Sequence, residues 1–360
     1  MFNPHQTILD ILEGQFETGR TKDVILRRFG LTDGRRQTLE SVGRDYGITR
    51  ERVRQIESNG LKALSGPEVV VELKPAFEMI KNHLSEHGDL KREERLLDDL
   101  VCVCEAKPGR KALAEGGTDP NFSKCRAALY LMLVLGELFV REKEDETLHT
   151  LWTIDKKSVS LARNVIGHLT KYLKRVSKVT DFKILYDEID TEDYDLDEKA
   201  LAAYLGASKE IDVNKFGEYG LIYWPEISPR GVRDKAYLIL RKYNKPLHFS
   251  EITDLINRNN LDQKTAQVET VHNELIKDQR FILIGRGIYA LSEWGYEPGT
   301  VTDIIIGLLK KHGSLSKEEI LEKVLEKRMI KENTVLINLQ DRKYFIKNDN
   351  GRYNLLEAVR

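Results

Sequence analysis

The spacing of apolar residues near the start of the chain predicts two short helices. Their apolar positions share one helical face each: Leu39, Val42 and Tyr46 in the first helix, Val53, Ile56 and Leu64 in the second. Gly47 stands where a left-handed residue would end the first helix, and Thr38 and Thr49 precede the two helices as N-caps. Two helices joined by a glycine turn predict a helix-turn-helix, whose second helix can enter the major groove of DNA.

A different pattern recurs four times after residue 66. A helix ends in a leucine, a polar turn follows, and an aliphatic residue precedes the next helix, as in "LSEHGDLKREERL" and "LKKHGSLSKEEIL". A third helical stretch and two alternating segments about a tight turn complete each repeat, as in "RFILIGRGIYALSEW". Three helices and a hairpin predict a winged helix, in units of roughly seventy residues.

The predicted fold is therefore mainly α with small β-hairpin wings. An N-terminal helix-turn-helix occupies residues 1–66, and four tandem winged helices occupy residues 67–155, 156–227, 228–296 and 297–360. The helix "CRAALYLMLVLGELF" of the first winged unit is too apolar to read a groove, so we expect it in a core.

Charge adds a local signal. The chain has 57 basic and 58 acidic side chains, so it has no overall polycationic character. Positive charge gathers between Arg20 and Leu64, where basic residues clearly outnumber acidic ones. A patch of this kind is what attraction to phosphate requires.

The second predicted helix carries the candidate DNA contacts. Arg50, Glu51 and Gln55 lie outside its apolar face and are types that pair with guanine, cytosine and adenine. The arginines around them suit phosphates better. A solvated helix in which Glu51 pairs with Arg54 explains the same composition, and composition alone leaves both interpretations open.

The stretch from Arg27 to Leu64, with "RFGL", "TLESVGRDYG" and "TRERVRQIE", closely resembles region 4 of the bacterial sigma-70 family. The resemblance implies recognition of the minus-35 promoter element, with base contacts from Arg50, Glu51 and Gln55. It further implies two sets of contacts. Backbone contacts fall to Arg35, Arg36, Arg44, Thr49, Arg52 and Arg54, and contacts to the RNA polymerase beta flap fall to Leu26, Phe29 and Leu31. The sigma segment that melts the minus-10 element has no counterpart here, so we do not expect a self-sufficient initiation factor.

The third winged unit resembles the HARE-type winged helix in "KPLHFSEI", "VHNELIKD" and "RFILIGRGIYALSEWG". Relatives of that type include the N-terminal domain of the RNA polymerase delta subunit and domains of restriction and chromatin proteins. The resemblance points to transcription or to another DNA transaction.

The winged units give a weaker indication of DNA binding. The second contains "YDEIDTEDYDLDEK", whose acids would repel phosphate. The third and fourth are more basic, through Lys264, Lys277, Arg280 and Arg286 and through Lys331, Arg342, Lys343 and Arg352. Ordinary solvated surface charge is the favoured interpretation of both sets.

Other chemistry finds little support. Three cysteines without a fourth ligand favour buried thiols over zinc, and no phosphate loop, Rossmann glycine pattern or nucleophile elbow appears. We expect no enzyme, cofactor, metal or membrane span, and a cytoplasmic, nucleoid-associated location. The leading hypothesis is a sequence-specific transcription regulator that binds double-stranded DNA and RNA polymerase. The alternatives are a delta-type polymerase adaptor that does not read DNA and an accessory subunit of a restriction or defence system.

Overall fold

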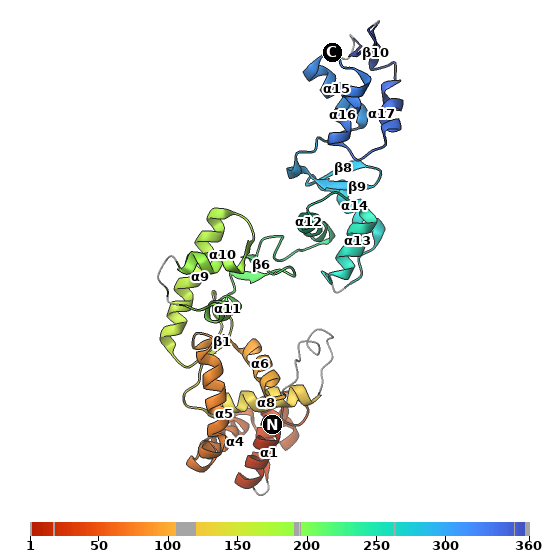
Figure 1. The fold of residues 1–360 in the computed structure, drawn as a ribbon. Helices are drawn as coiled ribbons and strands as arrows, with labels where there is room; N and C mark the ends of the chain where they lie inside the picture. Colours follow the sequence, from red (N-terminus) through yellow and green to blue (C-terminus); the bar gives the residue numbers. More distant parts are fainter. Residues whose placement is uncertain are drawn as a thin grey trace. The chain divides into compact units, whose positions relative to one another are not determined.

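The computed structural model is mainly α-helical with small antiparallel sheets, which confirms the predicted fold class (Figure 1). It describes residues 2–16, 19–105, 120–190, 194, 196–261, 264–348 and 350–356. The chain separates into two compact units, Met1–Asp212 and Val213–Arg360. We call residues 1–66 the HTH segment and the four following ranges the first to fourth winged units; these divisions stay predictions.

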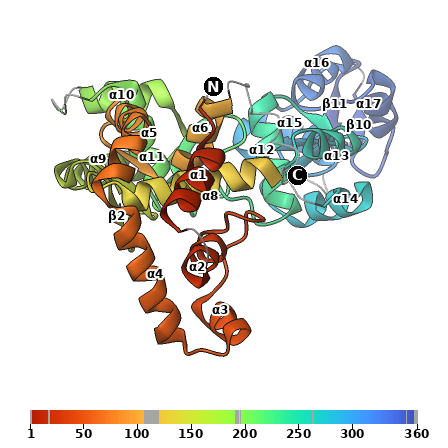
Figure 2. The same ribbon diagram turned by 90° about the horizontal axis from the view of Figure 1, so that it is seen from below.

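Four helices form the HTH segment: α1 (Pro4–Gln15), α2 (Arg20–Phe29), α3 (Leu39–Tyr46) and α4 (Arg50–Leu64). Val24, Val42 and Val53 are fully buried and make a small core between α2, α3 and α4. Figure 2 shows α3 and the beginning of α4 projecting away from the rest of this compact unit. The other end of α4 enters a larger core through Leu64.

The first winged unit supplies the centre of that larger core. Its elements are α5 (Pro67–Ser85), β1 (Leu90–Arg92), α6 (Glu93–Glu105), α8 (Pro120–Leu135), β2 (Val140–Glu142) and β3 (Leu151–Thr153). Helix α8 is buried on most of its surface, which confirms that this apolar helix belongs to a core. One continuous apolar cluster joins α8 to Ile8, Leu12 and Phe29 of the HTH segment. The HTH segment therefore shares its main core with the first winged unit.

The second winged unit contributes elements to both compact units. These elements are α9 (Lys156–Val176), β4 (Thr180–Asp181), α10 (Phe182–Asp190), α11 (Glu198–Ala207), β5 (Ile211–Val213) and β6 (Glu218–Leu221). Helix α9 buries a stripe that includes Val165, Leu169 and Leu173, as its apolar spacing predicts.

The second compact unit contains the third and fourth winged units. The third comprises α12 (Val232–Tyr243), β7 (Leu247–His248), α13 (Phe249–Arg258), α14 (Val268–Lys277), β8 (Phe281–Gly285), β9 (Ile288–Leu291) and the 3-10 turn Ser292–Trp294. The fourth comprises α15 (Val301–His312), α16 (Lys317–Lys327), α17 (Glu332–Leu339), β10 (Phe345–Lys347) and β11 (Tyr353–Leu355). Each has its own apolar core.

The recurring aliphatic residue between the first two helices has a structural role that the spacing did not reveal. Leu90 and Leu247 lie in short strands that pair antiparallel with the second arm of their own wing, at Thr153 and Tyr289. Leu315 makes the equivalent isolated bridge to Tyr353. The repeat therefore encodes a third strand that fastens each of these wings to its helices.

Candidate nucleic-acid interface

The turn between α3 and α4 follows from a few local contacts. The Thr38 hydroxyl accepts from Ser41 N at 3.1 Å, and the Thr49 hydroxyl accepts from Arg52 N at 3.2 Å. Gly47 has a φ of 62°, which favours glycine, so both predicted caps and the predicted helix end are confirmed.

Gly43 is also required, because a Cβ there would lie 2.7 Å from the carbonyl oxygen of Ile48. The Ile48 amide donates to the Gly43 carbonyl at 2.9 Å and closes the turn. This close approach sets the angle at which α4 leaves α3.

The three predicted base contacts lie on exposed positions of the first turns of α4. Arg50, Glu51 and Gln55 are exposed, while Val53 between them is buried. Arg50 pairs with Glu40 of α3 at 3.0 Å, and its side chain is 69% exposed. The structure therefore brings the three residues to one solvent-facing surface.

The paired-helix alternative is also realised in this free protein. Arg54 donates to both carboxylate oxygens of Glu51, at 2.9 and 2.7 Å, and Arg52 donates to Gln55 at 3.1 Å. Arg54 lowers the pKa of the Glu51 carboxyl, and Glu51 raises the pKa of Arg54. These pairs are exposed to water and contribute little to stability, so an incoming base or phosphate can replace them.

The predicted phosphate contacts divide into two groups. Arg44, Thr49, Arg52 and Arg54 are exposed on α3 and α4, beside the base-contact residues. Arg35 and Arg36 lie in the loop before α3, and the Arg36 guanidinium stacks 3.4 Å from the centre of the Tyr130 ring on α8. Tyr130 thus already engages one of the arginines that the sequence assigns to phosphate.

Two further arginines of α2 act inside the HTH segment. Arg28 pairs with Glu57 of α4 at 2.9 Å, and Arg27 pairs with Asp45 of α3. The Tyr46 hydroxyl donates to Asp23 at 2.7 Å, which joins α3 to α2. Sequence reasoning missed these contacts, since their partners are 18 to 29 positions apart with no periodic signal.

The predicted polymerase contacts lie deeper than expected. Phe29 is 6% and Leu31 is 1% exposed, and both belong to the core shared with α8. Leu26 packs against this core and is partly buried. As placed here, Phe29 and Leu31 present no surface to a partner, because the first winged unit covers them.

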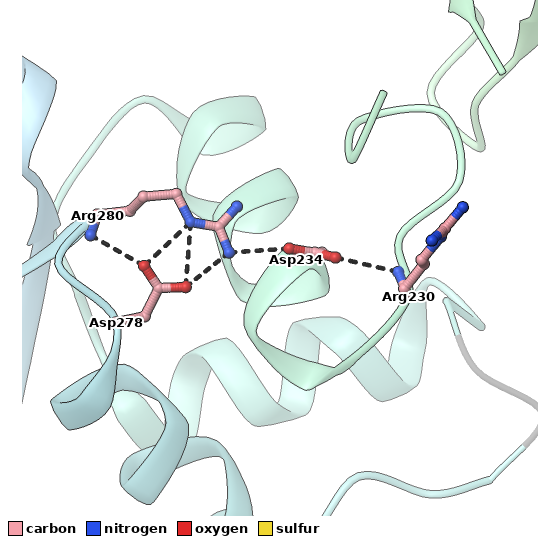
Figure 3. Close-up of polar contacts among 4 residues, drawn as sticks. All are labelled: Arg230, Asp234, Asp278 and Arg280. Carbon is pink, nitrogen blue, oxygen red and sulfur yellow. Dashed lines mark hydrogen bonds and ion pairs between the residues drawn. The ribbon is translucent and has the colours of Figure 1, made fainter. Parts of the chain in front are cut away.

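The third winged unit ties up a cation that the sequence left as a surface charge. Arg280 donates to both oxygens of Asp278 and, at 2.8 Å, to Asp234 of α12; the Arg230 amide donates to the other Asp234 oxygen (Figure 3). These contacts raise the pKa of Arg280 and lower that of Asp278. Arg280 therefore holds α12 to the turn before β8 and is not available to phosphate.

Replacing Arg280 by alanine is expected to destabilise the second compact unit by about 1–2 kcal/mol, since bonds to charged groups are lost but a third of the side chain stays in water. Thermal unfolding would measure the loss. Arg286→Ala, at an exposed wing position, is the matched control and should melt like the parent. An unchanged melting temperature for Arg280→Ala would contradict the structural role.

A cluster in the first winged unit has the donor types of a metal site. Ligand atoms of His83, His87 and Asp99 lie within 4.8 Å of one another. The Lys91 ammonium, however, lies 2.5 Å from Asp99 and 3.2 Å from the His83 ring nitrogen. Lys91 already supplies the positive charge that a metal ion would bring, so the cluster does not fit a metal.

Comparison with known proteins matches two parts of the chain. Residues 18–65 match the family model "Sigma-70, region 4", and residues 231–294 match the HARE-HTH model, a "restriction endonuclease HTH domain". Both resemblances inferred from the sequence are confirmed. The HTH segment is a sigma-70 region 4 module, and the third winged unit is a HARE-type module. Within the described residues, no helix combines the length and apolar character needed to cross a bilayer.

Among curated proteins, the chain is similar to the RNA polymerase sigma factor SigA of Listeria monocytogenes and of Listeria innocua, each 47% identical over 73 residues. SigA of a Bacillus species is 45% identical over 73 residues. The match covers 20% of this chain and 18% of each relative, so most of each sigma factor has no counterpart in the alignment.

Proposed function

We propose that this protein is a transcription regulator that binds double-stranded DNA and reads a promoter-like sequence through α4. One observation carries the proposal. The first turns of α4 hold Arg50, Glu51 and Gln55 outward on a helix that Val53 anchors and that the Gly43 turn orients. A helix presented in this way can insert into the major groove with its N-terminal residues leading. Arg44, Arg52 and Arg54 would then fix it on the phosphates.

RNA polymerase is the proposed protein partner, through the beta flap. Support comes from the sigma-70 region 4 match and from relatives that are RNA polymerase sigma factors. The part of α2 open to such a partner is around Leu26, with Phe29 and Leu31 as its buried support. The protein would then act on the nucleoid in the cytoplasm.

Selection of bound duplexes from a random pool, with and without RNA polymerase, tests the DNA-reading proposal. We expect enrichment of one short motif that resembles a minus-35 element, in both arms of the experiment. A pool that stays random in both arms would refute sequence reading.

A second candidate is a polymerase adaptor that does not read DNA. The observation in its favour is that Arg50 and Glu51 are already paired, with Glu40 and Arg54. Capture of polymerase without DNA, together with an unenriched pool, would establish this alternative.

A further inference from the structure

The wing of the first winged unit contacts the unit that follows it. Leu148, between β2 and β3, forms an antiparallel bridge with Ser208 at the end of α11. The Lys209 amide donates to Thr147 at 2.8 Å, and the His149 amide donates to Ala207 at 2.9 Å. This wing is therefore occupied by a protein contact.

The next two hairpins are occupied in the same sense. Phe216, in the turn between β5 and β6, packs against the core of the third winged unit, with the Lys242 ammonium 5.1 Å from its ring centre. In the third wing, Ile284 of β8 accepts from the Met329 amide at 3.1 Å. Arg328, only 4% exposed, donates to the carbonyls of Leu283, Glu297 and Gly299 and locks the fourth unit onto β8.

The fourth wing differs. The hydrogen bonds and ion pairs of β10 and β11 stay inside their own unit, with Tyr353 bonded to Leu315 and Arg352 bonded to Glu319 at 2.8 Å. Ile346 and Lys347 of β10 are exposed. Within the described part of the chain, this is the wing that no following segment covers.

The same unit carries cations that the fold does not neutralise. Lys331 at the start of α17, Arg342 and Lys343 in the turn after it, and Lys347 on the wing are all exposed. None of them forms an ion pair with an acid among the described residues, although Lys347 lies 5.9 Å from the Tyr353 ring centre. Arg280 and Arg352, by contrast, are held by carboxylates.

The backbone of α17 adds to this positive surface. No side chain caps its first turn, which leaves amide groups beside Lys331 open to an anion. Glu332 and Asp341 are the acids nearest in sequence, and Asp341 accepts from the Lys343 amide. The surface therefore keeps an excess of positive charge along α17, the turn after it and the wing.

We propose that α17 and the fourth wing form a second DNA-binding surface, which contacts the phosphates of the duplex outside the site read by α4. The proposal rests on the proposed DNA-binding function. Four unneutralised cations on a free helix and wing fit a polyanion, because each phosphate contact releases a condensed counterion. The third unit, whose Arg280 is tied up and whose wing is covered, is not expected to share this role.

The test compares the full-length parent with the variant K331A/R342A/K343A/K347A on a short duplex that contains only the selected motif and on the same motif with long flanks. We expect the parent to prefer the long duplex and the variant to lose that preference. Its salt dependence on the long duplex should fall by roughly 0.9 for each phosphate contact removed. Affinity for the short duplex should not change.

The matched control K310A/K311A/K317A/K323A removes four charges from α15 and α16 and should behave like the parent. Unchanged thermal unfolding would show that both variants are folded. If the first variant keeps the parent's affinity and salt slope on the long duplex, the second surface is refuted, whereas loss of motif preference in an Arg50, Glu51 and Gln55 variant would still support the α4 reader. Loss of polymerase capture with unchanged DNA binding would identify the surface as a protein contact and would also overturn the proposal.

Discussion

Replacement of Arg50, Glu51 and Gln55 together by alanine removes the preference of this protein for its best DNA site. Each bidentate base contact that is lost should raise the Kd for that site by roughly tenfold to a hundredfold, while binding to unrelated DNA changes little. The physical reason is that base contacts carry the sequence information and phosphate contacts carry most of the unspecific affinity. Titration of the selected site and of a scrambled site, at one fixed salt concentration, gives the ratio directly.

Helix α4 supplies its own control. Ser58, Asn59 and Lys62 are exposed farther along the same helix, so S58A/N59A/K62A makes three changes without touching the first turns. This variant should keep the parent's preference. Equal affinity of the Arg50, Glu51 and Gln55 variant and the parent for the selected site would rule out α4 as the reader.

Phe29→Ala is expected to lower the free energy of unfolding of the first compact unit by about 3–5 kcal/mol, which is typical for loss of a buried phenyl ring. Phe29 is 6% exposed and its ring centre lies 6.2 Å from that of Tyr130 on α8. The residue should therefore act through the core that joins the HTH segment to the first winged unit. Denaturant unfolding of the full chain, followed by the fluorescence of Trp152 in that core, measures the effect.

Leu26→Ala separates stability from polymerase contact, because Leu26 lies at the edge of the same core and is only partly buried. We expect a smaller loss of stability there and a larger loss of polymerase capture. A Phe29→Ala protein of unchanged stability that no longer captures polymerase would mean that the ring is a surface contact, contrary to its burial.

The local part of the site could be predicted from the sequence because its signals lie within a few residues of one another. Thr38, Gly47 and Thr49 each act on a backbone group one turn away, and the alternation of β8 and β9 fixes a hairpin in the same way. The contacts that decide which arginines are free were not predictable. The stacking of Arg36 on Tyr130 and the bond from Arg280 to Asp234 depend on how whole helices pack, and no short-range pattern reports that.

The burial of Phe29 and Leu31 has the same origin. Both have the spacing of an apolar helix end, which a free helix-turn-helix could offer to a partner, but α8 is a helix that is apolar on most of its surface and must be covered. The first winged unit therefore uses a surface that the sequence of the HTH segment alone would leave exposed.

The shared core also limits how freely this DNA reader can be exchanged during evolution. Leu12, Phe29, Leu31 and Leu64 are buried in the cluster to which α8 belongs, so residues 1–66 on their own would carry that apolar surface into water. A recombination event that transferred only this segment would have to transfer α8 as well or replace the apolar side chains with polar ones. The unit of inheritance for promoter recognition in this protein is therefore larger than the motif that resembles a sigma factor.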